Sequence, residues 1–102
     1  MKEIDFMPRF IEDEVNDAEK YIRKALEVRA FNRSLADVLF NLSTEEIKHM
    51  NMLHSEISKI IEGYKAKGVE PPDDMMRFYE ILHSWSIEDA KAVKILQNMY
   101  LE

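Results

Sequence analysis

The chain has 102 residues, no cysteine, two glycines, three prolines and a net charge of −6. This length supports one domain with one modest core. Without cysteine the chain forms no disulfide and no thiolate metal site. The acidic balance argues against nucleic acid as a partner, because neutralising phosphates requires clustered lysine and arginine. With 46% hydrophobic residues and few helix breakers, the composition predicts one all-α domain over residues 1–102.

The chain has no apolar run near the ~18 residues that cross a bilayer. Its first residues, "MKEIDFMPRF", lack the apolar stretch of a signal peptide. We therefore expect no membrane partner and a cytoplasmic location.

Apolar residues recur at helical spacing in three stretches, which predicts three helices. We expect these helices at about residues 4–30, 34–65 and 72–100. A short loop between the first two helices favours an antiparallel hairpin.

The two breaks between these helices carry recognisable end signals. At the first, Ser34 followed by Asp37 resembles a capping box. At the second, Gly68 suits a helix C-terminus, and Pro71-Pro72 precedes two aspartates that suit the first turn of a helix.

Each helix shows one apolar stripe when it is projected at about 100° per residue. The stripe residues are Met7, Phe10, Ile11, Ala18, Tyr21, Ile22 and Ala25 in the first helix; Leu35, Val38, Leu39, Leu42, Met50, Leu53, Ile57, Ile60 and Tyr64 in the second; and Met75, Phe78, Leu82, Trp85, Ala92, Val93, Leu96 and Tyr100 in the third. Each stripe also contains one acidic residue, namely Glu14, Glu46 or Asp89, and the second adds His49 one turn after Glu46. A buried, unpaired carboxylate is costly, so acids at similar depth suggest that a cation lies between them.

Glu14, Glu46 and His49 are the candidate metal ligands. Glu14 lies about 17 residues before the first loop and Glu46 about 14 after it, so antiparallel helices bring them within roughly one turn of the same height. Carboxylate and imidazole ligands suit iron, manganese or zinc. The alternatives are that these residues lie at the core boundary with their heads in water, or that they form a buried polar network.

Other polar residues leave further possibilities open. Asp89 is an additional candidate ligand, which could instead orient His49, lie near a bundle end, or complete a mononuclear site within one chain. Glu80 and His83 repeat the Glu-x-x-His spacing, but Glu80 projects away from the stripe and we expect it to be solvated. His54 lies on the shoulder of the second helix.

Two segments resemble a known hairpin. The stretch "FIEDEVNDAEKYIRKALEVR" followed by "LADVLFNLSTEEIKHMNMLHSEI" is similar to the first helical hairpin of the ferritin-like superfamily, most closely its rubrerythrin-like members. In that pattern a Glu precedes a Tyr by seven residues, as Glu14 precedes Tyr21, and a Glu-x-x-His follows about thirty residues later, as Glu46 to His49 do here. The match covers about residues 6–58.

The resemblance implies a di-metal carboxylate protein, with iron the first expectation and manganese or zinc the alternatives. A complete site of this type takes ligands from four helices, so one hairpin supplies half of it. The resemblance therefore implies a homodimer or higher homo-oligomer in which two hairpins form a four-helix bundle. It also implies ferroxidase or peroxidase-like oxidoreductase chemistry with oxygen or peroxide as the small oxidant. The competing interpretation is a metal-free helical scaffold or adaptor of ferritin-like shape.

Overall fold

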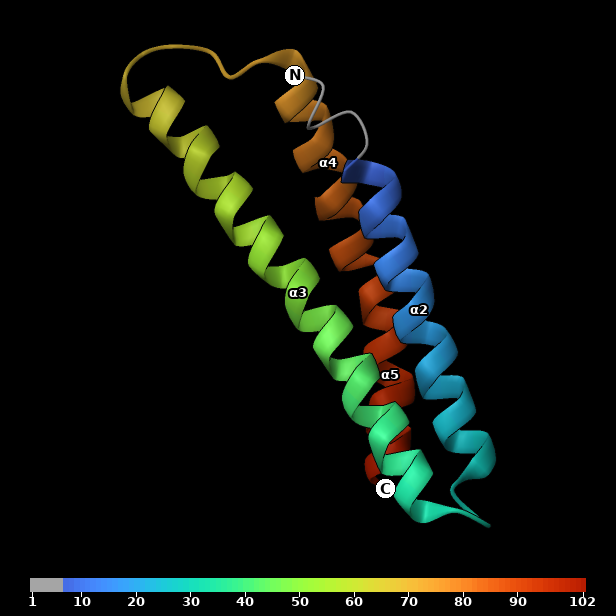
Figure 1. The fold of residues 1–102 in the computed structure, drawn as a ribbon. Helices are drawn as coiled ribbons and strands as arrows, with labels where there is room; N and C mark the ends of the chain where they lie inside the picture. The colour runs from blue at the N-terminus through green and yellow to red at the C-terminus, as the bar shows by residue number, and fades with distance from the viewer. Residues whose placement is uncertain (1–6) are drawn as a thin grey trace.

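The structure is a computed structural model that describes residues 7–102, with side chains from residue 12 onward. Its elements are α2 (Met7–Val28), α3 (Arg33–Ala66), α4 (Asp73–Ile87) and α5 (Asp89–Leu101). The all-α prediction is confirmed, because the described residues contain helices and no strand. In Figure 1, α2 and α3 form an antiparallel hairpin, and α4 and α5 follow one another along it. The bundle is elongated, with principal extents of 57 × 24 × 18 Å.

The turn between α2 and α3 is tight and capped by Asn32. The Asn32 side-chain oxygen accepts a hydrogen bond from the Leu35 backbone N–H at 3.0 Å, which satisfies one free donor of the first turn of α3. The expected cap at Ser34 is therefore wrong, and the helix begins one residue earlier. Of the predicted first helix, residues 4–6 lie outside the described part of the chain.

The end of α3 and the start of α4 follow the sequence signals. Gly68 has a φ of 70°, and the N–H groups of Gly68 and Val69 donate to the carbonyls of Lys65 and Tyr64 at 3.0 Å each. This is the hydrogen-bond pattern of a Schellman motif, which needs a left-handed residue after the helix. Pro72 then precedes α4, whose first turn contains Asp73 and Asp74, as expected.

The predicted helix over residues 72–100 is present, but a break at Glu88 divides it into α4 and α5. Glu88 keeps right-handed angles (φ −92°, ψ −58°), and its N–H donates to the Ser84 carbonyl at 2.9 Å. The chain therefore bends without reversing. Ser86 contributes to the bend, since its hydroxyl donates to the His83 carbonyl at 2.9 Å and such bonds compete with the helical pattern.

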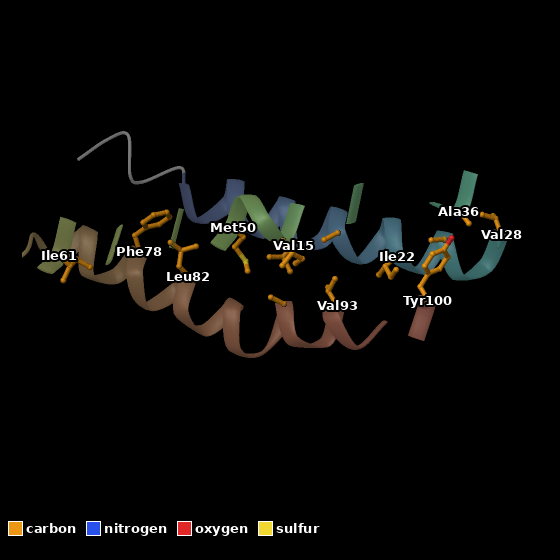
Figure 2. Close-up of a cluster of buried hydrophobic side chains, with 14 of the residues drawn as sticks. Val15, Ile22, Val28, Ala36, Met50, Ile61, Phe78, Leu82, Val93 and Tyr100 are labelled. Carbon is orange, nitrogen blue, oxygen red and sulfur yellow. The ribbon is translucent and has the colours of Figure 1, made fainter. Parts of the chain in front are cut away.

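The core runs the length of the bundle, between the hairpin and the α4–α5 pair (Figure 2). Its buried apolar residues are Val15, Ala18, Ile22, Ala25, Val28, Ala36, Ile47, Met50, Ile61, Met75, Phe78, Leu82, Ala90, Val93 and Tyr100. The predicted stripes of the first and third helices contain eight of these residues: Ala18, Ile22, Ala25, Met75, Phe78, Leu82, Val93 and Tyr100.

The buried face of α3 differs from the predicted stripe. Leu35, Val38 and Ile60 were expected in the core, but they are 45%, 53% and 38% exposed. The buried residues of α3 are Ala36, Ser43, Ile47, Met50 and Ile61, and of these the predicted stripe contained Met50 alone. The apolar arc of α3 is thus wider than one chain covers, and part of it remains at the surface.

A buried chain of hydrogen bonds joins three helices in the core. The Gln97 side-chain amide of α5 donates to the Ser43 hydroxyl of α3 at 2.9 Å, and that hydroxyl donates to the Ala18 carbonyl of α2 at 2.7 Å. Both side chains are buried. Because buried polar groups are costly without partners, this chain fixes the register of the three helices.

We predict that Ser43→Ala lowers the free energy of unfolding by about 1–3 kcal/mol, because it leaves the buried Gln97 amide without its acceptor. Urea unfolding followed by circular dichroism measures the change. The matched control is Ser55→Ala, which removes an exposed serine hydroxyl from the same helix and should change stability by about 0.5 kcal/mol or less. Equal effects of the two substitutions would contradict the prediction.

Candidate metal centre

The three predicted ligands lie together in the structure. Glu14 comes from α2, and Glu46 and His49 come from α3. One potential ligand atom from each of the three side chains lies within 4.8 Å of the other two. A zinc or iron ion forms bonds of about 2.0–2.2 Å, so ligand atoms within this limit are close enough for one ion to reach all three.

The hairpin geometry explains why these residues meet. The tight turn at Asn32 makes α2 and α3 antiparallel, which brings Glu14 to the height of Glu46, as their distances from the loop predict. His49 follows Glu46 by three residues and therefore lies on the same side of α3. The predicted proximity of the three residues is confirmed, and their binding of a metal stays a prediction.

The site lies at the edge of the hairpin and not in the middle of the core. Glu14 and Glu46 are half-buried, and His49 is exposed. Glu46 had been expected at the centre of the buried stripe of α3. It lies instead between the buried face and the exposed apolar residues of that helix. This follows because α3 turns a different face toward the core than the stripe predicts.

The electrostatics of the site centre on Glu14. Burial raises the pKa of Glu14 above its ordinary value, the neighbouring Glu46 carboxylate raises that pKa further, and His49 partly offsets both effects. One carboxylate oxygen of Glu14 is buried and has no hydrogen-bond partner among the described residues. A buried acceptor in this condition is destabilising, and a proton or a cation would relieve it.

Asp89 does not join this group. It was expected in the middle of an apolar stripe, but it is exposed at the start of α5. Together with Asn16 and Glu19 of α2 it lines a small surface pocket. Within residues 12–102, the group of three or more potential ligands is Glu14, Glu46 and His49 alone.

The sequence pattern did not reveal a second group of polar side chains between α3 and α4. His54 of α3 packs against Tyr79 and His83 of α4, with ring centroids 5.4–5.8 Å apart. Glu80 is exposed, as expected. The four-residue spacing of Tyr79 and His83 places them on one side of α4, but only the tertiary structure brings His54 to them.

Comparison of the chain with protein-family models, with curated proteins and with solved structures found no match. In the described part of the chain, no helix combines the length and the apolar character required to span a bilayer.

We predict that Glu14→Gln stabilises the metal-free protein near neutral pH, because the amide carries no charge to desolvate. Solvent screens a half-buried group, so we expect a gain of less than about 1 kcal/mol. Between 4.5 and its raised pKa, Glu14 binds more protons in the folded than in the unfolded state. The stability of the wild type should therefore approach that of the variant as the pH falls through this window.

Urea unfolding in the presence of a chelator, at several pH values from 4.5 to 8, measures both effects. Glu12→Gln is the control, since Glu12 is an exposed carboxylate of the same helix and its loss should leave stability close to that of the wild type. If Glu14→Gln is no more stable than the wild type at pH 7, the charged carboxylate of Glu14 does not destabilise the folded protein, and the prediction is contradicted.

Proposed function

We propose that this chain is a ferritin-like metal protein in which Glu14, Glu46 and His49 bind iron. The observation that carries the proposal is the convergence of two half-buried carboxylates and an imidazole from two helices, with one Glu14 oxygen buried and without a partner among the described residues. An apolar side chain at position 14 would avoid that cost. A bound cation explains why a carboxylate is retained there.

The donor set is consistent with iron and also with manganese or zinc. Two carboxylates and one imidazole are ligands that these metals accept. Three protein ligands leave coordination positions open for water or for a small oxidant. The exposure of His49 leaves one side of the site accessible in a single chain.

We infer that a second copy of the chain completes the site. The uncovered apolar residues Leu35, Val38 and Ile60 belong to the same helix as Glu46 and His49. A two-fold contact between these faces would bury them and would bring two sets of Glu14, Glu46 and His49 together. The product would be a four-helix bundle with four carboxylates and two imidazoles, the ligand number of a di-metal site.

In such a dimer, Glu46 would bridge two metals, and Glu14 and His49 would be terminal ligands. A bound pair of iron ions would supply oxidation of Fe(II) by oxygen or peroxide. The residues of the chain would hold the ions at a fixed spacing and exclude bulk water from their inner side. Electrons would come from Fe(II) itself or from another protein.

We predict that the wild type purified from iron-supplemented medium contains about one metal ion per chain, as two metals in a dimer require. Glu46→Ala and His49→Ala should each lower that content at least tenfold, because each removes a ligand. Elemental analysis of the purified protein measures iron, manganese and zinc together. Glu45→Ala is the matched control, since Glu45 is the exposed neighbour of Glu46.

A wild type with no more metal than the Glu46→Ala variant would refute the proposal and favour a metal-free scaffold. One metal per chain in a monomer would favour a mononuclear site instead. The exposed position of Asp89 does not support its participation in such a site.

We predict that Val38→Glu converts the dimer to a monomer, because it would place two charges in a buried apolar contact. Size-exclusion chromatography with light scattering measures the mass of the particle. Ile95→Glu is the control, since Ile95 of α5 is also exposed, at 55%, but lies outside the hairpin. A monomeric wild type, or equal dissociation by both variants, would contradict the two-fold contact.

A further inference from the structure

Three aromatic rings form a compact triangle between α3 and α4. The ring centroids of His54 and Tyr79 are 5.4 Å apart, those of His54 and His83 are 5.7 Å apart, and those of Tyr79 and His83 are 5.8 Å apart. The planes are inclined to each other by only 12–26°. Each pair of rings is stacked, and the nearly equal separations show that the three rings form a triangle and not a single column.

His54 is the inner member of this triangle. Its Nε2 atom is buried and has no hydrogen-bond partner among the described residues, which is an unfavourable state for a polar atom. Burial lowers the pKa of His54, and the nearby His83 lowers it further. The neutral imidazole, which these effects favour, has the free lone pair that a metal ligand requires.

We propose that His54 and His83 form a second metal site, which links α3 to α4 through two imidazole nitrogens and takes a borderline divalent cation such as Cu²⁺ or Zn²⁺. Two imidazoles on one zinc ion have metal–nitrogen bonds of about 2.0–2.1 Å, which places their ring centres about 5 Å apart. The observed 5.7 Å is close to that distance. Because a nitrogen lone pair lies in the plane of its ring, the exposed His83 ring would turn out of its stacked position so that both lone pairs point to one ion.

The chemistry of this site differs from that of the first one. No third histidine or acidic residue joins His54 and His83 in a ligand group within residues 12–102, and Glu80, one turn before His83, is exposed. Nitrogen donors without carboxylates favour copper and zinc, whereas carboxylate-rich sites accept iron and manganese. The second site therefore stands independently of the function proposed for Glu14, Glu46 and His49.

The chain contains only three histidines, which makes the test direct. In a His49→Gln background, His54 and His83 are the remaining imidazoles. We would titrate this metal-free variant with Cu²⁺ and record electron paramagnetic resonance and thermal unfolding. We expect a copper signal with coupling to two nitrogens and a higher melting temperature with copper than without it.

Adding His54→Gln or His83→Gln to that background should weaken copper binding at least tenfold and remove the thermal shift. Because His83 is exposed, His83→Gln should keep the helical content of the parent, which circular dichroism checks. The variant in which all three histidines are replaced by glutamine serves as the background control, because the copper that it binds, for example at the N-terminal amine, does not involve an imidazole. If His49→Gln binds copper no better than that variant, the second site does not exist, whereas loss of iron in Glu46→Ala would concern only the first site.

Discussion

The close antiparallel contact between α2 and α3 is the constraint on which the rest of the structure depends. Small side chains make it possible, since Ala18 and Ala25 of α2 and Ala36 of α3 are fully buried and let the two backbones approach. The Asn32 cap fixes the short turn that aligns the helices. Without this alignment Glu14 would not reach Glu46 and His49, and the hydroxyl of Ser43 would not reach the carbonyl of Ala18.

The same contact creates an unfavourable arrangement of charge. It places the Glu14 carboxylate beside that of Glu46 in a half-buried position, which raises the pKa of Glu14. A leucine at position 14 would extend the apolar stripe and avoid this destabilisation. Residues that lower the stability of the folded protein often belong to functional sites, because a binding group must stay exposed to its ligand and without a partner in the protein.

Much of this arrangement is predictable from sequence, because it depends on local signals. Gly68 and Pro72 mark the end of α3 and the start of α4 by their fixed backbone preferences. The heights of Glu14 and Glu46 follow from the helical rise and the position of the loop. Both deductions use distances along one helix or across one short turn, where the chain leaves few alternatives.

The features that the sequence did not predict depend on tertiary packing. No Gly or Pro lies near the break at Glu88, and the Ser86 hydroxyl donates to the His83 carbonyl beside it, a type of bond that competes with the helical pattern. The buried face of α3 was predicted wrongly because its apolar arc includes both Leu35 and Ala36. Periodicity alone does not show which of the two residues faces the core. Ser43 and Gln97 are polar, and nothing in their local sequence indicates that they satisfy each other in the core.

The length of α3 explains how one helix can contribute to both proposed sites. With 34 residues it is longer than α2, which has 22, so its second half extends to pack against α4. His49 and His54 are five residues apart, which turns their side chains about 140° from each other around the helix. His49 therefore faces outward beside Glu46, while His54 faces inward toward Tyr79 and His83. The helix itself separates the group of Glu14, Glu46 and His49 from the group of His54 and His83, so the two proposed sites share no ligand.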